Sequence, residues 1–163
     1  MRLHLVAVAS VLAASTAIAH PAQSNAHDAQ QSIAVAPAAR PATAVVDAFH
    51  AALRRGDTKA AQSYLSDDAL IYEAGGVERG KREYASHHLG ADAAFAKAVP
   101  STITRRAGEA VGNIAWVATE GRTAGTYKDK AVDRITTETM VLRRRGASWK
   151  IVHIHWSSAA GAK

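Results

Sequence analysis

The sequence predicts an α+β fold in which helices cover one face of a curved antiparallel sheet. Helical periodicity is confined to the first half of the domain, and strand-like segments joined by short turns fill the second half. Helices first and strands later are typical of α+β domains. The 163 residues suffice for one domain.

Two short helices open the domain. Apolar residues from Val45 to Leu53 recur at i, i+1, i+4, i+7 and i+8, the spacing of one helical stripe. Gly56 then suits the C-terminus of this helix, and Asp57 can cap a second short helix. We therefore expect a helix, a Gly-Asp break and another helix.

The third predicted helix carries a histidine on its inward stripe. It starts near Lys81, and Tyr84, His88 and Phe95 recur in it at helical spacing. Pro100 ends the segment, because proline cannot continue a helix.

Strand-like segments account for the rest of the domain. A first strand precedes the third helix, and four more follow it with short turns between them. Strands joined in this way are typical of an antiparallel meander. The expected strands are residues 69–73, 101–109, 114–124, 131–145 and 147–158.

The last strand is the most informative stretch of the chain. Successive side chains of a strand point to opposite faces. One face then holds Trp149, Ile151, His153, His155 and Ser157, and the other holds Lys150, Val152, Ile154 and Trp156. Both faces carry large apolar groups, so the strand is expected to be central and covered on both sides.

The composition excludes several kinds of site. The chain has no cysteine, which rules out disulfides, thiol nucleophiles and cysteine-ligated metals. Its net charge is +6, but the basic residues are spread along the chain, so no nucleic-acid partner is expected. The glycines form no dinucleotide or phosphate-binding motif, and no cofactor is predicted.

The N-terminus has the features of a secretory signal. Arg2 precedes a short apolar stretch, and Ala-Ile-Ala at residues 17–19 matches the small-x-small cleavage pattern. The stretch is too short for a comfortable membrane span. The expected localisation is periplasmic or secreted, with an uncleaved anchor or a buried helix as alternatives. The predicted divisions are a signal peptide at residues 1–19, a flexible tail at 20–40, the domain at 41–158 and a C-terminal tail at 159–163.

The order of elements, with the ending Trp-Lys-Ile-Val-His-Ile-His-Trp-Ser, resembles the nuclear transport factor 2-like superfamily. Within it the chain is most similar to SnoaL-like domains and to the association domain of calcium/calmodulin-dependent kinase II. The resemblance rests on Gly56-Asp57 and on residues 72–76, 84–89 and 149–155. It implies a cystatin-like cone, in which a bent sheet wraps a long helix around a pocket, and pairing of subunits through the sheet.

The resemblance does not identify the function, because the superfamily includes isomerases, cyclases, dehydratases, ligand binders and assembly modules. The kinase association domain lines its pocket with arginines, whereas the corresponding positions here are Glu120, Met140 and Trp156. An anion-binding arginine cluster is therefore not implied. A helix histidine near the pocket, at His88 or His87, is implied.

We expect an aromatic, apolar pocket with two polar groups. Glu120 and His88 are the candidate acid–base residues, because a carboxylate walled by tryptophans would have a raised pKa. In the alternative, the aromatic residues fill a core and Glu120 pairs with an arginine. The expected ligand-binding residues are Tyr72, Trp116, Arg122, Met140 and Trp156.

The two histidines of the last strand have a different expected role. The resemblance puts His153 and His155 on the outer face of the sheet, where they would belong to a dimer interface. No metal is predicted, although His87, His88 and Glu73 are ligand types that offer an alternative metal site.

The predicted function is an exported domain that binds a small apolar or amphipathic molecule and forms a homodimer, with catalysis left open. The alternatives are an acid–base isomerase, dehydratase or cyclase of the same fold, and a module that oligomerises through its sheet. The ligand and the reaction do not follow from the sequence.

Overall fold

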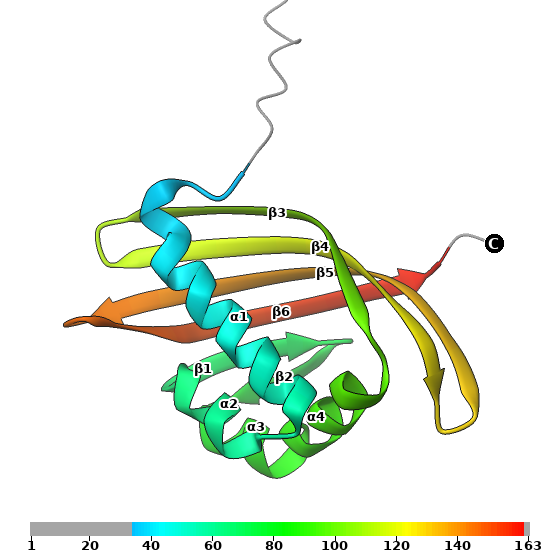
Figure 1. The fold of residues 1–163 in the computed structure, drawn as a ribbon. Coiled ribbons are helices and arrows are strands. Elements are labelled where there is room, and N and C mark those ends of the chain that lie inside the picture. Colours follow the sequence, from blue (N-terminus) through cyan, green and yellow to red (C-terminus); the bar gives the residue numbers. More distant parts are fainter. Residues whose placement is uncertain (1–33, 162–163) are drawn as a thin grey trace, which may run out of the picture. The chain divides into compact units, whose positions relative to one another are not determined.

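The computed structural model describes residues 34–161 and has the α+β architecture that the sequence predicts. Figure 1 shows α1 (Arg40–Arg55) crossing a six-stranded sheet, with α2 (Thr58–Tyr64), α3 (Lys81–His87) and α4 (Leu89–Ala98) gathered near one end of it. The predicted signal peptide and most of the predicted tail lie outside the described residues. No helix in residues 34–161 is both long and apolar enough to cross a membrane.

The domain begins slightly before the predicted boundary. A single turn of 3-10 helix, η1 (Pro37–Ala39), leads into α1, and Ala39 is fully buried. The backbone N–H of Ala36 donates to the carbonyl of Gly108 at 2.8 Å. The last residues of the predicted tail are therefore part of the packed domain.

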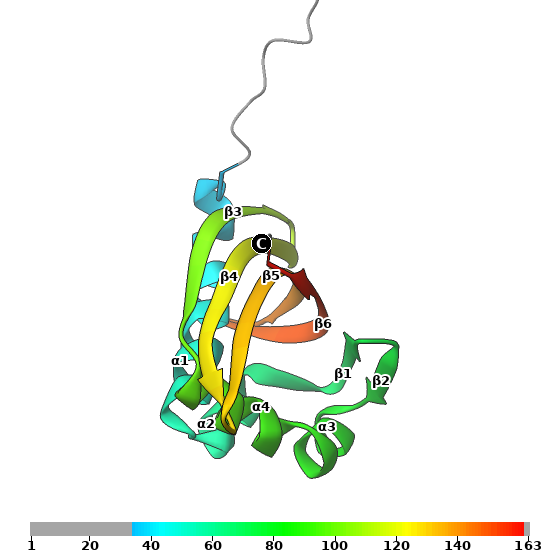
Figure 2. The same ribbon diagram turned by 90° about the vertical axis from the view of Figure 1, so that its right-hand side faces the viewer.

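The sheet has the strand order β2-β1-β6-β5-β4-β3. All neighbouring strands are antiparallel except β1 and β6, which are parallel. Figure 2 shows how the far ends of the long β4–β5 hairpin bend toward the helices. The strands are β1 (Leu65–Glu73), β2 (Gly76–Arg79), β3 (Ser101–Val111), β4 (Ile114–Tyr127), β5 (Lys130–Arg145) and β6 (Ser148–Ala160). The short β2 was not predicted.

The first two helices form as their sequence predicts. Gly56 ends α1 in the left-handed conformation at φ +73°, and the Asp57 carboxylate caps α2 by accepting from the backbone N–H of Ala60 at 2.9 Å. The buried stripe of α1 consists of Ala42, Val46, Phe49, Ala52 and Leu53. This stripe packs α1 on the sheet.

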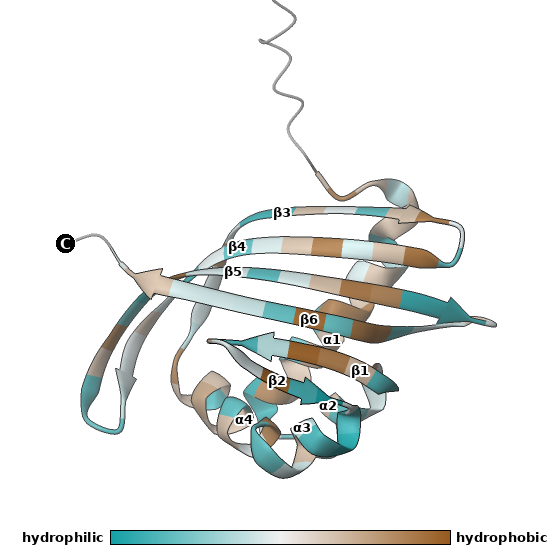
Figure 3. Cartoon of the chain, turned by 180° about the vertical axis from the view of Figure 1, so that it is seen from behind, coloured by the Kyte–Doolittle hydropathy of each residue, from teal (hydrophilic) through white to brown (hydrophobic). Residues whose placement is uncertain are grey.

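The face of the sheet that packs on α1 is called the inner face, and the opposite one the outer face. On the inner face Val117, Met140 and Ile154 are consecutive cross-strand partners and fully buried. The rung next to them, on the outer face, includes Trp116, which is 36% exposed. Figure 3 shows that hydrophobic positions of β1, β4, β5 and β6 gather in the part of the sheet that α1 crosses.

The third predicted helix is two helices that meet at His88. The buried residues Tyr84 and Leu89 are five positions apart, whereas one continuous helical stripe requires three or four. The helix therefore changes phase at His88, where φ is −115°. The His88 side chain is 56% exposed and does not lie on an inward stripe as expected.

The last strand does not alternate strictly, which differs from the prediction. Leu142 pairs with Ile151 but Val141 pairs with His153, so Val152 is an extra residue in a β-bulge. Trp149 and Ile151 before the bulge and Ile154 after it all pack in the same core. His153 and His155 lie on the outer face.

Candidate functional site

Polar side chains from five strands lie in one rung of the inner face. Because direct cross-strand partners have Cβ atoms about 4.5–5.5 Å apart, these side chains are immediate neighbours. The rung consists of Arg106 on β3, Thr119 on β4, Glu138 on β5, Trp156 on β6 and Glu73 on β1, each the partner of the next. We call it the polar rung.

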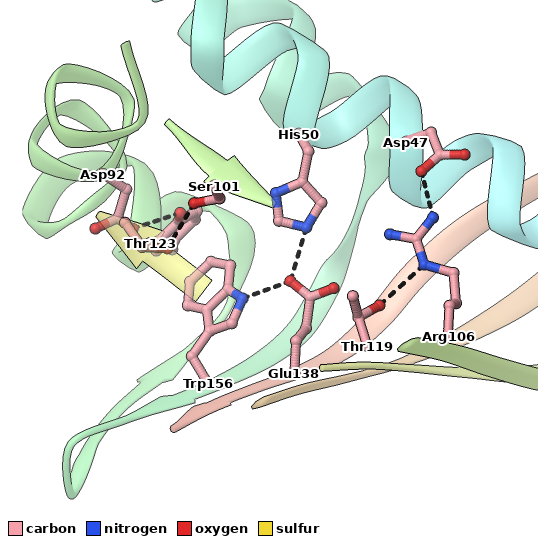
Figure 4. Close-up of polar contacts among 10 residues, drawn as sticks. Asp47, His50, Asp92, Ser101, Arg106, Thr119, Thr123, Glu138 and Trp156 are labelled. Carbon is pink, nitrogen blue, oxygen red and sulfur yellow. Dashed lines mark hydrogen bonds and ion pairs between the residues drawn. The ribbon is translucent and has the colours of Figure 1, made fainter. Parts of the chain in front are cut away.

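Helix α1 supplies two polar side chains that face this rung. Asp47 and His50 are three residues apart and follow the buried Val46 and Phe49, so both project from the same flank of the apolar stripe. Figure 4 shows Asp47 reaching Arg106 and His50 reaching Glu138. Contacts between helix and sheet thus complete the cluster.

Glu138 lies at the centre of the cluster. Its Oε2 atom accepts hydrogen bonds from His50 Nε2 at 2.7 Å and from the indole Nε1–H of Trp156 at 2.6 Å (Figure 4). The Glu138 side chain is only 9% exposed. Its second oxygen, Oε1, is buried and has no hydrogen-bond partner among the described residues.

The surroundings keep Glu138 ionised. Burial by itself would raise the pKa of this carboxyl, but the hydrogen bonds from His50 and Trp156, the positive charge that His50 carries when it is protonated, and the charge of Arg106 outweigh burial and lower the pKa. A charged carboxylate only accepts hydrogen bonds, so Nε2 of His50 carries the proton. The other ring nitrogen, Nδ1, makes no hydrogen bond within residues 34–161, and the His50 side chain is 29% exposed.

Arg106 is held by two neighbours. One terminal nitrogen, Nη1, donates to Asp47 at 2.5 Å, and Nε donates to the Thr119 hydroxyl at 3.0 Å. The Arg106 side chain is 14% exposed, against 58% for Asp47. Figure 4 shows the remaining guanidinium nitrogen turned toward His50 and Glu138.

Aromatic rings wall the other side of Glu138. The Trp156 ring stacks on Phe49 with centroids 6.4 Å apart, and Tyr84 lies 6.3 Å from Trp156. The Tyr84 hydroxyl donates to Asp92 at 2.7 Å. Burial raises the pKa of Asp92 despite this hydrogen bond. The cluster thus has aromatic side chains on one side of Glu138 and charged side chains on the other.

The residues predicted to form the pocket are divided between the two faces. Glu120 lies on the outer face, where its side chain is 57% exposed and 4.0 Å from Arg105. Trp116 shares that face, and Arg122 is paired there with Asp133 at 2.7 Å. Side chains of β4 alternate between the faces, and the inner face holds Val117 and Thr119, so the expected placement of Glu120 in the pocket does not hold.

The remaining predicted ligand residues also separate. Tyr72 is on the outer face, where its ring meets His153 edge-on with centroids 5.1 Å apart. Met140 is a fully buried core residue. Trp156 lies on the inner face and, through Glu138, belongs to the cluster.

Neither predicted helix histidine belongs to the polar rung, although the charge of Glu73, the member of the rung on β1, also acts on His88. His88 contacts the buried carboxylate of Glu78 on β2, and that hydrogen bond raises the pKa of His88. His87 is the last residue of α3 and is exposed. Within residues 34–161, no three His, Asp or Glu side chains are placed to hold a metal ion, including the alternative set with Glu73.

Sequence reasoning missed His50 and the central role of Glu138. His50 is four residues after Val46, so it borders the apolar stripe of α1. Glu138 alternates with Met140 and faces the core of a strand, an unusual place for a charged residue. Both signals are local in the sequence, but the contact between His50 and Glu138 depends on the packing of α1 across β5.

Two shallow depressions lie elsewhere on the domain. One is lined by Leu65, Lys81, Arg145 and Lys150 with nearby serines, and the other by Thr102, Thr104 and Arg122 with Pro100 and Ala124. Neither includes a residue of the polar rung.

The chain was compared with known families and proteins. A family model described as a SnoaL-like domain matches residues 42–161. The search of curated proteins gave no match.

Several solved structures share the fold. A candidate ketosteroid isomerase from Shewanella frigidimarina is 39% identical, with a TM-score of 0.69 over 72% of this chain and 94% of that one. A candidate dehydratase of the NTF2-like family from Streptomyces avermitilis is 19% identical, with a TM-score of 0.61 over 76% and 98%. The CaMKII hub of S. rosetta is 22% identical, with a TM-score of 0.62 over 77% and 98%.

Proposed function

The chain belongs to the family of SnoaL-like domains, and on that premise we propose that it is an acid–base enzyme of the isomerase or dehydratase type. Its substrate is a small, largely apolar molecule that binds against the inner face beside Trp156. His50 is the catalytic residue that moves the proton, and Glu138 positions it.

One observation carries this proposal. A buried carboxylate holds the Nε2–H of a partly exposed histidine at 2.7 Å, which leaves Nδ1 free to accept a proton. The same division of roles is found in catalytic His–carboxylate pairs, where the carboxylate fixes the tautomer and stabilises the imidazolium. Histidine titrates near neutral pH, which suits it to both proton abstraction and return.

The proposed chemistry is a proton transfer next to a carbonyl group. Nδ1 of His50 takes a proton from the carbon beside the carbonyl, and the electron pair of the broken C–H bond moves to the carbonyl oxygen. The imidazolium then returns the proton to another carbon, which completes an isomerisation. Alternatively, it protonates a departing hydroxyl as the C–O bond breaks, which releases water. The Glu138 carboxylate compensates the positive charge in either case.

The names of two related structures support this reaction class. The 39% identical Shewanella protein is a candidate ketosteroid isomerase. The Streptomyces protein, which shares the fold, is a candidate dehydratase.

The experiment measures proton exchange rather than one reaction. The protein is incubated in D₂O with cyclohexanone, and separately with 3-cyclohexenone, whose isomerisation to the conjugated enone produces a strong short-wavelength ultraviolet band. We expect catalysed exchange or isomerisation in the wild type and a loss of at least 100-fold in His50→Ala, since general bases contribute about 10²–10⁴-fold. Glu120→Gln is the matched control, because that carboxylate is exposed on the outer face. Equal rates in wild type and His50→Ala would contradict the assignment.

Homodimerisation and export complete the proposal. The outer face carries the exposed apolar residues Tyr72, Ile114, Trp116 and Ile135, which support pairing of two copies through the sheet. Export rests on the signal-like N-terminus, and N-terminal sequencing of the protein secreted by its native host tests it. A mature chain that still begins at Met1 would contradict cleavage after residue 19.

A further inference from the structure

One of the two depressions, near the turn between β5 and β6, is lined by cations from three elements. Arg145 is the last residue of β5, Lys150 lies near the start of β6, and Lys81 is the first residue of α3. Figure 3 shows hydrophilic positions at the end of β5 and at the start of β1 on the same side of the domain. We call this depression the basic depression.

The register of the β5–β6 hairpin puts two of these cations on one face. Arg145 is the cross-strand partner of Ser148, and Lys150 follows two residues later, so their side chains point the same way. The alternate pair is Arg144 and Trp149, in which the guanidinium lies 5.6 Å from the centre of the indole ring. Arg145 and Lys150 therefore line the depression, whereas Arg144 packs on the other side of the hairpin.

One carboxylate lines the basic depression, and it does not neutralise the three cations. Asp67 pairs with Lys81 at 2.5 Å, and the hydrogen bond from Lys81 holds the pKa of Asp67 below its usual value. The Asp67 side chain is 93% exposed, and ion pairs of exposed groups are weak. Two positive charges remain in excess along the depression.

The other two cations have no carboxylate partner within residues 34–161. Lys150 donates to the backbone carbonyl of Ser63, which is a neutral acceptor. Arg145 is exposed and makes neither an ion pair nor a side-chain hydrogen bond with the described residues, and the same holds for the hydroxyl of Ser148. Because an ammonium group carries three N–H donors and a guanidinium five, most donors around the depression are unused.

The size of the basic depression suits one charged group. Its volume is about 280 Å³, just below the range of about 300–1,000 Å³ for pockets that enclose a whole drug-sized molecule. Leu65 lines it and is only 2% exposed, so part of the depression is apolar. Salt screens partly buried charges less than fully exposed ones. An anionic group can enter while the rest of its molecule stays outside.

We propose that the basic depression binds the phosphate group of a phosphate monoester. Such a group carries a charge of about −1.5 to −2 at pH 7 and offers three acceptor oxygens. Arg145 and Lys150 donate charge-assisted hydrogen bonds to two of the oxygens, and the Ser148 hydroxyl donates to the third. A carboxylate has one charge and two oxygens, so it would leave part of this set unused. The site is separate from the polar rung, and the inference does not depend on acid–base catalysis by His50.

The test is a titration of the nitrogen-15-labelled full-length protein at pH 7, followed by NMR. The probes are phenyl phosphate and benzoate, which keeps the ring but carries a carboxylate, at equal ionic strength. We expect saturable shifts of the amide signals of Ser66, Lys81 and Ser148, and a dissociation constant at least tenfold lower for phenyl phosphate. Equal affinities for the two probes, or shifts that do not saturate, would overturn the proposal.

Two variants separate recognition from attraction by net charge. Arg145→Gln and Arg144→Gln remove the same charge at adjacent positions on opposite sides of the hairpin. Arg145→Gln should weaken the binding of phenyl phosphate at least fivefold, whereas Arg144→Gln, the matched control, should bind it as the wild type does. Equal weakening in both variants would contradict a phosphate site.

Vesicles distinguish two sources of the phosphate group. Phosphatidic acid presents a phosphate monoester at a membrane surface, so the protein is sedimented with phosphatidylcholine vesicles that contain or lack this lipid. Binding of phenyl phosphate and of the phosphatidic acid vesicles, with both reduced in Arg145→Gln, would support the proposal with a lipid as a source. Binding of phenyl phosphate without the vesicles would support it with a soluble ligand. Binding of the vesicles without phenyl phosphate would overturn it, because the surface charge of the membrane would then be what the protein recognises.

Discussion

Glu138 of β5 and Trp156 of β6 are direct cross-strand partners, and the indole N–H of Trp156 donates to the Glu138 carboxylate at 2.6 Å. His50 donates to the same oxygen from across the helix–sheet interface. The carboxylate is therefore stabilised in its charged form by two partners from different elements. This arrangement makes both stability and proton transfer depend on one buried group.

The contribution of Glu138 to the free energy of unfolding should be lost at acid pH. Its pKa is lowered in the folded protein, so its contribution is complete above the unfolded pKa and is lost as the pH falls through the folded value. At pH 7, Glu138→Gln is expected to cost about 1–3 kcal/mol of unfolding free energy, as for loss of a buried charged hydrogen bond. Urea unfolding between pH 7 and pH 3 measures both proteins, and their difference should shrink toward acid pH. A difference that grows on acidification would contradict the lowered pKa.

Trp156→Phe separates the indole hydrogen bond from the aromatic wall. Phenylalanine keeps a ring beside Phe49 but lacks the N–H that reaches Glu138. We expect a loss of about 1.5–3 kcal/mol of unfolding free energy, the range for hydrogen bonds to a charged group. The pKa of Glu138 should rise, which carbon-13 NMR of the labelled carboxyl group follows. An unchanged Glu138 pKa would show that the indole does not stabilise the charge.

His88 should titrate above the ordinary range of histidine. The hydrogen bond to buried Glu78 raises its pKa, and the charges of Glu78, Asp92 and Glu73 add to the effect. Because the folded pKa is raised, the pair stabilises the fold below the unfolded pKa and the contribution is lost as the pH rises through the folded value. A proton NMR titration should show the His88 midpoint fall in Glu78→Gln.

Gly121 is a position where any side chain is expected to disturb the sheet. A Cβ atom there would lie 2.8 Å from the Thr102 carbonyl oxygen and 3.2 Å from the Thr136 hydroxyl. Gly121→Ala should therefore destabilise the domain by about 1–3 kcal/mol, the usual cost of overpacking. Gly90→Ala in α4 is the control, because nothing lies within 4 Å of its Cβ and alanine is the better helix former. Thermal unfolding compares the two, and equal melting temperatures would show that the strands shift freely.

The outer face should set the oligomeric state. Trp116→Glu places a charge at the middle of the exposed apolar face without touching the polar rung. We expect light scattering after size exclusion to show a dimer for the wild type and a monomer for the variant, with the circular dichroism spectrum unchanged. Lys97→Gln, at an exposed position of α4, lowers the net charge by the same one unit and serves as the control. A wild type that is monomeric at high concentration would contradict pairing through the sheet.

Much of the fold follows from local sequence signals. The stripe of α1 and the Gly56-Asp57 break are fixed by residues close in the chain, and the structure confirms both. Membership in the SnoaL-like family was also predicted, and the match to residues 42–161 confirms it. These features depend on periodicity and capping, which one sequence displays directly.

The site was harder to predict because it depends on which alternate residues of each strand face the core. In β4 both Trp116 and Val117 are apolar, so alternation alone does not tell which of them faces the core. The resemblance to the kinase association domain put Glu120 in the pocket, and Trp116 was expected there with it. The structure instead buries Val117 and leaves Trp116 exposed on the outer face, so that Thr119, not Glu120, belongs to the polar rung.

The bulge at Val152 has a consequence for comparing this chain with its relatives. Trp149 and Ile151 pack in the core at odd positions, and Ile154 does so at an even one. Deleting the extra residue would leave the later side chains on their present faces, because Ile151 would still oppose Leu142 and the next residue, His153, would still oppose Val141. The bulge thus absorbs a difference of one residue in the length of the strand. Two family members that differ by this residue would keep the equivalents of Trp149 and Trp156 on the same face, although the number of residues between them would differ by one.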